Sequence, residues 1–400
     1  MKRTCCVPAD SESPRPHMPC HPARALAARP SLSFHMTDFN AMAAVLEQRF
    51  REGAGQSWEA SDFEALAHGV FRNQFEHCDP YRALCVRRGV TPETVSAWAD
   101  IPAVPATAFK YFDFVSHPGG EVEKVFLTSG TTRGSEGRGR HSVPRLKLYK
   151  ASCMDPFRRA LVPDVQEIDV LSLIPSSEAA PNSSLSFMVE VVAGRFGSTM
   201  EWLVDGRGRW VDDVEARFSR VRRQGGPALV LGTALSFIHL KERYGDLDLS
   251  LPAGSRVMET GGFKGAGRDI TRAELHRWIV ASLGVAPEAV VNEYGMTELL
   301  SQLYEPVLHE GLAATGAHVA PPWLAVRALD PTTLREAAEG EPGILCFFDL
   351  ANLGSVSHVL TEDVGAIRDG RVHLRGRTEG AEPRGCSRAM DDLMRAAVRE

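Results

Sequence analysis

The sequence predicts an α/β fold, with mainly parallel sheets layered with helices and a small β subdomain after them. Two patterns support this prediction. Three buried apolar runs each lead into a glycine turn, at residues 228–233, 256–265 and 290–298, and helical patterns lie between them. Past about residue 318 the chain changes to short strand-like runs. Alternating strands and helices build parallel sheets, whose binding sites lie along the carboxyl edge.

The composition is that of an enzyme-sized globular protein. Of the 400 residues, 44% are hydrophobic and 24% are charged, and both fractions are ordinary for a soluble chain. A formal net charge of −6 gives no basic footprint for nucleic acid. No apolar run approaches the roughly 18 residues that a membrane span needs. Eight cysteines without a Cys-x-x-Cys pair do not suggest a disulfide framework, so we expect a reduced, cytoplasmic setting.

The chain divides into three predicted parts. Residues 1–35 are rich in Pro, Arg, His and Cys without an apolar period, so we expect a disordered extension. Residues 36–317 form the predicted α/β core, and residues 318–400 form the small β subdomain with a cysteine-bearing C-terminal arm. The extension also holds potential zinc ligands whose spacing matches no familiar site: Cys5, Cys6, His17, Cys20 and His21.

The core begins with helices. Apolar residues recur at helical spacing from residue 38 to about 88, which predicts two or three helices with an interruption at Pro80. Cys78 and Cys85 lie on either side of this proline and are expected to be buried structural thiols. Cys153 and Cys346 are also expected to be structural. Further strands are predicted at 122–127, 169–175, 324–328, 343–349, 365–367 and 372–374, with a helix at 183–188.

Residues 127–134, Leu-Thr-Ser-Gly-Thr-Thr-Arg-Gly, follow the strand 122–127 and form a candidate phosphate loop. Glycines let successive backbone N–H groups converge, hydroxyls add donors, and the arginines that precede His141 add positive charge. A Walker sequence, Gly-x4-Gly-Lys-Ser/Thr, does not occur. Taken alone, the same run is also typical of a flexible linker.

Three further motifs have chemistry of their own. Residues 294–298, Tyr-Gly-Met-Thr-Glu, offer a ring for a purine, a hydroxyl for a phosphate and a carboxylate for Mg2+; alternatively, Thr297 and Glu298 begin a helix. Residues 361–365, Thr-Glu-Asp-Val-Gly, supply acceptors for a ribose diol or form an ordinary turn. Gly376-Arg377 supplies a cation for ribose or phosphate, or only a solvated side chain.

Together and in this order, these motifs resemble the adenylate-forming superfamily of acyl- and aryl-CoA synthetases, luciferases and peptide-synthetase adenylation domains. The finer match is to the acyl-protein synthetase family, which includes the synthetase subunit of the bacterial-luminescence fatty acid reductase complex. It rests on Ser-Ser-Leu-Ser-Phe-Met (183–188), Gly-Gly-Phe-Lys-Gly (261–265), Glu-Tyr-Gly-Met-Thr-Glu-Leu (293–299) and Gly-Arg-Thr-Glu-Gly-Ala-Glu-Pro-Arg-Gly-Cys-Ser (376–387). The resemblance covers roughly residues 40–390 and implies the fold of the adenylate-forming N-terminal domain.

The resemblance implies ATP-dependent activation of a carboxylic acid, which would be a fatty acid, to an acyl-adenylate. It implies that Glu298 holds Mg2+, that Thr297 meets the α-phosphate, and that Asp363 and Arg377 bind ribose. We add Lys264 as a contact to phosphate or carboxylate. The β,γ-phosphates would be held by Thr128, Ser129, Gly130, Thr131 and Thr132, and adenine would lie near Gly261, Gly262, Tyr294 and Gly295.

The sequence departs from the superfamily in its C-terminal part. Most members carry a mobile C-terminal domain with an assisting lysine, but here 23 residues follow Arg377 and the last lysine is Lys264. We therefore expect the large mobile lysine domain to be absent, which disfavours an ordinary CoA ligase. Cys386 matches the family's Arg-Gly-Cys-Ser ending. It lies between Arg384 and Arg388, which favour its thiolate, and we expect a flexible tail after it.

The first hypothesis is thus an acyl-protein synthetase that forms an acyl thioester on Cys386 and passes the acyl group to a partner protein, a reductase or a carrier protein. One alternative is a stand-alone adenylating enzyme that acylates a carrier protein or CoA directly. Another, from a different class, is a nucleotide-binding scaffold subunit without turnover. The acyl pocket is predicted between the helix of Phe187 and Met188 and the helix of Phe237 to His239.

Overall fold

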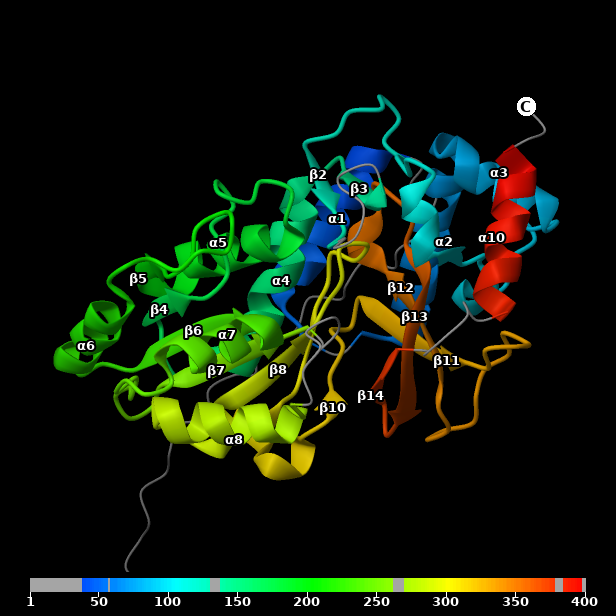
Figure 1. Ribbon diagram of the computed structural model, residues 1–400. Coiled ribbons are helices and arrows are strands. Elements are labelled where there is room, and N and C mark those ends of the chain that lie inside the picture. The colour runs from blue at the N-terminus through cyan, green and yellow to red at the C-terminus, as the bar shows by residue number, and fades with distance from the viewer. Residues whose placement is uncertain (1–37, 57, 130–136, 262–269, 378–383, 398–400) are drawn as a thin grey trace, which may run out of the picture. The chain divides into compact units, whose positions relative to one another are not determined.

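The structure, a computed structural model, describes residues 38–56, 58–129, 137–261, 270–377 and 384–397, with side chains in the last range from 390 to 396 (Figure 1). All of them belong to one compact unit that spans Phe34–Glu400. The predicted extension 1–35 and its candidate zinc ligands lie outside the described residues. The helices are α1 (Phe39–Glu52), α2 (Ala60–His77), α3 (Asp79–Arg87), α4 (Leu146–Leu161), α5 (Ser184–Phe196), α6 (Val214–Gln224), α7 (Ala234–Tyr244), α8 (Arg272–Leu283), α9 (Val307–Glu310) and α10 (Arg384–Ala397).

Within the described ranges, the strands fall into two six-stranded sheets and one hairpin. Their bounds are β1 (Val104–Pro105), β2 (Lys124–Leu127), β3 (Arg140–Val143), β4 (Ile168–Ser172), β5 (Gly197–Trp202), β6 (Ala228–Thr233), β7 (Arg256–Thr260), β8 (Val290–Tyr294), β9 (Leu303–Tyr304), β10 (Ala317–His318), β11 (Leu324–Leu329), β12 (Gly343–Asp349), β13 (His358–Arg368) and β14 (Arg371–Arg377).

The first sheet has the predicted α/β architecture. Its order is β5-β4-β6-β7-β8-β9, and all pairs are parallel except β8 with β9. Successive strand residues point to opposite faces. Leu229 and Leu231 join the core with α4 and α5, whereas Val230 joins the core with α6, α7 and α8 (Figure 1). The strands are therefore buried on both faces, which explains why they are continuous apolar runs.

The second sheet is mostly antiparallel, in the order β10-β14-β13-β12-β11, with β1 parallel to β13. All four strands predicted after residue 318 are present. However, β13 is 11 residues long, so residues 361–365 lie inside a strand and not in an ordinary turn. A bulge between Val364 and Gly365 shifts the register toward β14. Because β1 pairs with β13, this sheet also takes a strand from the N-terminal third of the chain.

The N-terminal segment forms three helices, as predicted. Asp38 caps α1 by accepting a hydrogen bond from the Ala41 N–H at 2.7 Å. Helix α2 ends at His77, and Pro80 occupies the first turn of α3, where its missing N–H costs nothing. Packing against the second sheet fixes α2, because Gln74 donates to the Asn352 carbonyl and to the Ser357 hydroxyl at 3.0 and 2.9 Å.

The predicted structural thiols are buried, and none of them forms a disulfide with another described residue: Cys78, Cys85, Cys153 and Cys346. Burial raises the pKa of Cys78, Cys85 and Cys153 to about 12, so these three remain thiols at neutral pH and do not act as nucleophiles. Within the described residues, we find no helix that combines the length and the apolar character needed to cross a membrane.

Candidate active site

Two motifs that are far apart in the sequence meet at the edge of the first sheet. Tyr294 ends β8, and its hydroxyl donates to Asp363 Oδ2 of β13 at 2.8 Å. Arg377 lies opposite Asp363 on β14 and donates from Nε to Asp363 Oδ1 at 2.6 Å. The alternative prediction, that Arg377 is only a solvated side chain, is therefore wrong. Each carboxylate oxygen has two lone pairs, so Asp363 keeps acceptor capacity for further hydroxyl donors.

The surroundings of these three residues shift the pKa values of Tyr294 and Arg377. The ring of Tyr294 stacks on Phe347 with centroids 5.6 Å apart and an interplanar angle of 24°. Burial and the neighbouring Asp363 charge raise the pKa of the Tyr294 phenol well above its usual value, so it remains a hydrogen donor. Desolvation alone would lower the pKa of Arg377, but the Asp363 charge raises it above its usual value. The Asp363 carboxylate is thus an acceptor held between two groups that keep their hydrogens at neutral pH, the Tyr294 hydroxyl and the Arg377 guanidinium.

Glu298 lies in the turn after β8 and is 8% exposed. Burial raises the pKa of its carboxyl to about 7, with the Asp363 charge adding to the rise and the charges of Arg377 and Lys110 opposing it. The turn continues into β9 and not into a helix, so the alternative that Thr297 and Glu298 begin a helix is wrong. A buried carboxyl whose ionised form is only partly compensated by its neighbours is suited to a cation.

Side chains from three other segments hold this turn by its backbone. Asp349 accepts from the Leu300 N–H at 2.9 Å and from the Ser301 hydroxyl at 2.8 Å. Asn352 donates to the Glu298 carbonyl at 2.8 Å, and His141 Nδ1 lies 2.6 Å from the Thr297 carbonyl. Sequence reasoning missed Asp349, Asn352 and His141, because no spacing along the chain marks a side chain that binds a distant carbonyl.

The candidate phosphate loop leaves β2 and returns in β3, which pair as a hairpin. Thr128 closes its base: its hydroxyl accepts from the Gly139 N–H at 2.8 Å, and its own N–H donates to the Gly139 carbonyl at 2.9 Å. Arg138 donates to the carbonyls of Leu127 and Thr128. A Cβ on Gly139 would lie 3.0 Å from Thr128 Cγ2, so this close approach favours glycine. Ser129 is exposed, and Gly130, Thr131 and Thr132 lie outside the described residues.

Two glycines of the predicted adenine site have conformational reasons for being glycine. Gly261 follows β7 with φ +78°, which side chains with a Cβ rarely adopt. A Cβ on Gly295 would lie 2.5 Å from Glu293 Oε1. Gly262 and Lys264 lie outside the described residues, so their predicted contacts stay predictions.

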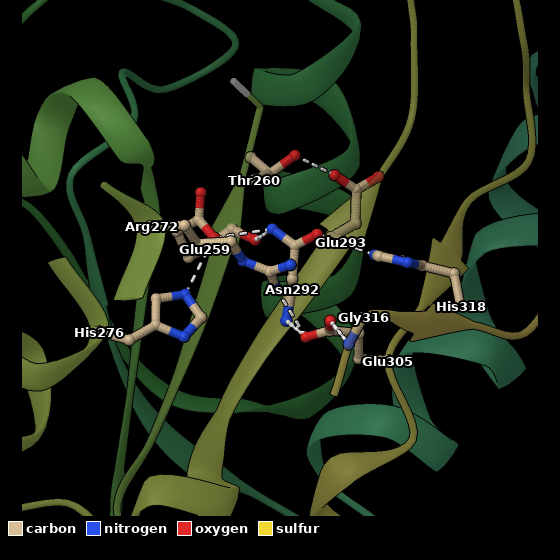
Figure 2. A network of polar contacts seen from close by, with 9 residues as sticks. All are labelled: Glu259, Thr260, Arg272, His276, Asn292, Glu293, Glu305, Gly316 and His318. Atoms are coloured by element: carbon tan, nitrogen blue, oxygen red, sulfur yellow. Dashed lines mark hydrogen bonds and ion pairs between the residues drawn. The ribbon is translucent and has the colours of Figure 1, made fainter. Parts of the chain in front are cut away.

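A buried polar network lies at the same edge of the sheet (Figure 2). Asn292 donates to Glu259 Oε2 at 2.7 Å and lies 2.8 Å from His318 through its Oδ1. Thr260 donates to Glu293. Helix α8 adds Arg272, which binds Glu305 at 2.7 Å, and His276, which lies 3.3 Å from Glu259. The network joins β7, β8 and α8, and a motif search could not have found it, because its members are far apart in the sequence.

Across the described ranges, no group of three or more His, Cys, Asp or Glu side chains could hold a metal ion alone. An ion bound by Glu298 would therefore take its other ligands from phosphate oxygens and water, as Mg2+ does in nucleotide sites. The hard oxygens of the Glu298 carboxylate and its only partly compensated burial fit that ion.

Cys386 lies near the start of α10, although its side chain is outside the described part of that helix. The residues after it form a helix and not the predicted flexible tail. Helix α10 packs against α3, where Asp392 lies 3.5 Å from Arg87 and 3.4 Å from Arg88, and Leu393 is fully buried.

The predicted acyl pocket between α5 and α7 is wrong. Phe187 of α5 packs against Phe126 and Tyr149 on one face of the first sheet. Phe237 of α7 belongs to the core on the opposite face. The sheet therefore separates the two helices.

Comparisons with known proteins give a family model and relatives that match most of the chain. The family model described as "Acyl-protein synthetase, LuxE" matches residues 59–395. A long-chain-fatty-acid–luciferin-component ligase of Vibrio harveyi is 24% identical over 371 residues, which cover 86% of this chain and 92% of the relative. The corresponding ligase of Aliivibrio fischeri is 21% identical over 355 residues, covering 84% and 90%.

Solved structures show the fold. A 2-hydroxyisobutyryl-CoA ligase in the postadenylation state superposes with a TM-score of 0.60 at 15% identity, covering 80% of this chain and 68% of the ligase. An open conformation of such a ligase gives a TM-score of 0.56 at 15% identity, with 80% and 73% covered. The predicted fold of adenylate-forming enzymes is therefore confirmed.

Proposed function

Because the chain belongs to the acyl-protein synthetase family, and is thus an acid-activating ligase, we propose that it uses ATP and Mg2+ to activate a long-chain fatty acid and passes the acyl group through Cys386 to a partner protein. The relatives from Vibrio harveyi and Aliivibrio fischeri are named for long-chain fatty acids, which favours that substrate class over aromatic acids. Their names also give a luciferin component and not CoA as the second partner of the ligation, and the family model describes an acyl-protein synthetase, which together favour a protein acceptor over CoA.

The observation that carries the proposal is the junction of Tyr294, Asp363 and Arg377 beside the buried Glu298. Residues 69 positions apart along the chain form one site only in the folded protein. The site pairs an acceptor carboxylate suited to a ribose diol with a second carboxyl suited to Mg2+. The remaining proposed contacts follow the family: Thr128, Ser129, Gly130, Thr131 and Thr132 for the β,γ-phosphates, Gly261, Gly262 and Gly295 near adenine, Thr297 for the α-phosphate, and Lys264 for phosphate or carboxylate.

The chemistry needs charge neutralisation and alignment more than a strong base. A carboxylate oxygen of the fatty acid forms a bond to the α-phosphorus of ATP, the bond from that phosphorus to the bridging oxygen breaks, and pyrophosphate leaves. Mg2+ on Glu298 would neutralise phosphate charge. The Cys386 thiolate then attacks the acyl carbon and AMP leaves, which gives a thioester that a nucleophile of the partner protein cleaves.

Carboxylate-dependent ATP–pyrophosphate exchange tests the first step. We expect exchange with long-chain fatty acids and much less with short or aromatic acids. Asp363→Asn should raise the KM for ATP roughly tenfold, since it removes a charged partner of Arg377 and a ribose acceptor. Asp212→Asn, at an exposed position, is the matched control. Absence of exchange with every acid while ATP still binds would contradict the proposal and support a nucleotide-binding scaffold.

Intact mass after incubation with ATP and fatty acid tests the second step. We expect an acyl adduct that Cys386→Ser abolishes while pyrophosphate exchange continues. If Cys386→Ser still acylates an added protein or CoA at the wild-type rate, the enzyme transfers its acyl group directly, and the thioester step is wrong.

A further inference from the structure

A small cavity lies behind the turn that carries Thr297 and Glu298. Residues of β3, of the start of α4 and of the segment 351–355 line it, together with Leu300. It leaves about 10 Å³ for the centre of a water molecule, which is about the room that one water requires. Its position matters because two of its lining residues, His141 and Asn352, bind the carbonyls of Thr297 and Glu298.

Four of the residues that line the cavity also carry a buried polar atom that lacks a hydrogen-bond partner within the described part of the chain. These atoms are His141 Nε2, Arg145 Nε, Asn352 Oδ1 and Ser355 Oγ. The side chains of His141, Asn352 and Ser355 belong to residues that are at least nine-tenths buried. Unpaired buried polar atoms are costly, and the presence of four of them on residues around one cavity calls for a shared polar partner.

The hydrogen-bonding role of each atom follows from its known partners. The Thr297 carbonyl can only accept, so His141 Nδ1 carries the hydrogen and Nε2 of the neutral ring is an acceptor. Burial lowers the pKa of His141 to about 4, which keeps the ring neutral at physiological pH. Asn352 donates its Nδ2 hydrogens to the carbonyls of Glu298 and Val356 at 2.8 and 3.1 Å, so its Oδ1 is a second acceptor.

The unpartnered atoms of the cavity residues are therefore two acceptors, His141 Nε2 and Asn352 Oδ1, and two groups that can donate, Ser355 Oγ and Arg145 Nε. A water molecule has two hydrogens to donate and two lone pairs to accept. It satisfies all four groups at once, whereas an anion would face two acceptors and a cation would face two donors.

We propose that this cavity binds one ordered water, and that the water, His141 and Asn352 act together as a positioning unit for the Thr297–Glu298 turn. The water donates to His141 Nε2 and Asn352 Oδ1 and accepts from Ser355 and Arg145. It thereby fixes the ring and the amide whose opposite atoms bind the two successive carbonyls. The positioning role rests on the proposed function, since it acts through Glu298 as the Mg2+ ligand. Small displacements of such a ligand reduce catalysis strongly.

His358 provides a matched control. Its Nδ1 also lies 2.6 Å from a backbone carbonyl, that of Ile101, its Nε2 has no partner in the described residues, and burial lowers its pKa to about 4. The Ile101 carbonyl is outside the Thr297–Glu298 turn. His141→Leu and His358→Leu therefore remove the same interactions from the fold, but only the first releases the proposed metal ligand.

Kinetics, ATP binding and thermal stability should be measured on the full chain. We expect His141→Leu to lower kcat of exchange at least about tenfold and to raise half-saturating Mg2+ by a similar factor. His141→Asn keeps a donor toward Thr297 but loses Nε2, so its defect should be smaller. Ser355→Ala removes one water partner and should cost about two- to threefold. His358→Leu should lower Tm comparably and change kcat less than about twofold.

The outcomes separate the two proposals. Equal kinetic effects of His141→Leu and His358→Leu, or an unchanged Mg2+ requirement, would overturn the positioning role. If either variant is too unstable to assay, Ser355→Ala and His141→Asn decide through the same Mg2+ titration. A high-resolution crystal structure without density between His141, Asn352 and Ser355 would overturn the water. If the wild type exchanges with no acid, the proposed function fails, and Mg2+-dependent ATP affinity in the same variants then tests the positioning role without turnover.

Discussion

Buried carboxyl groups dominate the electrostatics of the site at the scale of single residues. Burial raises the pKa of Glu293 and of Glu298 to about 7, and that of Asp349 to about 6. Each is held in a low-dielectric environment that disfavours its charged form. Asp349 accepts several hydrogen bonds that oppose this effect, whereas Glu293 has the Thr260 hydroxyl against the repulsion of Glu259. The carboxyls of Glu293 and Glu298 therefore titrate close to neutral pH.

Glu293 gives a test of this property that is independent of the proposed metal ligand. Its folded-state pKa of about 7 lies above the ordinary value of 4.5, so the native state binds the proton more tightly than the unfolded state. Its contribution to stability is complete below about 4.5 and is lost as the pH rises through 7. This contribution of Glu293 to the free energy of unfolding is at most about 3 kcal/mol.

Glu293→Gln keeps an acceptor for Thr260 without the titrating charge. We therefore expect the wild-type Tm, measured without nucleotide, to fall between pH 5 and 8 more steeply than the Tm of Glu293→Gln. The exposed Glu341→Gln is the control and should follow the wild type. Parallel profiles for wild type and Glu293→Gln would show that Glu293 ionises without cost in the fold.

The sequence identifies Tyr294, Glu298, Asp363 and Arg377 because each belongs to a motif with its own chemistry. It does not identify what they contact. His141 and Asn352 have no recognisable motif, since their role is to bind carbonyls that folding brings to them. Such partners are set by tertiary packing, and one sequence without coordinates contains no signal for them.

At the scale of elements, strands β4, β6, β7 and β8 of the first sheet could be predicted, because buried parallel strands are continuous apolar runs. The predicted run at 228–233 coincides with β6, and the predicted run at 290–298 begins with β8. The acyl pocket failed because periodicity does not say on which face of a sheet a helix packs. Only the structure shows that Phe187 and Phe237 pack into the hydrophobic cores on opposite faces of the sheet.

Helix α10 carries Cys386, the residue proposed to hold the acyl group, in its first turn. Its partly exposed ion pairs with Arg87 and Arg88 contribute less than about 1 kcal/mol each. The fully buried Leu393 is the stronger anchor, worth about 2–5 kcal/mol against Ala.

Leu393→Ala should therefore loosen α10 and lower the rate of thioester formation at Cys386 severalfold, while the rate of pyrophosphate exchange stays within about twofold of the wild type. Hydrogen exchange of α10 amides and acyl-adduct formation are the measurements. Met394→Ala, at a 43% exposed position on the same helix, should leave both unchanged. Equal losses of exchange and of adduct in Leu393→Ala would mean that α10 supports the adenylation site itself.

At the scale of the whole molecule, the question is where the functional chain begins. The family match starts at residue 59, but the packing starts earlier. In α1, Phe39 is 2% exposed and Leu46 and Phe50 are fully buried, and α1 packs against α4. Asn40 of α1 also accepts from Arg145 at 3.0 Å, and Arg145 lines the cavity behind the Thr297–Glu298 turn. The N-terminal helix therefore belongs to the same core as the site.

Two truncations test this argument. A chain that begins at Met36 keeps the Asp38 cap and all of α1, so its Tm and its pyrophosphate exchange should match those of the full chain. A chain that begins at residue 59 loses the buried side chains of α1, each worth about 2–5 kcal/mol, and should fail to fold or to exchange. Because native stability is only about 5–15 kcal/mol, losing Phe39, Leu46 and Phe50 together is enough. Reduced exchange in the chain from Met36 at unchanged Tm would instead assign residues 1–35 a part in the reaction.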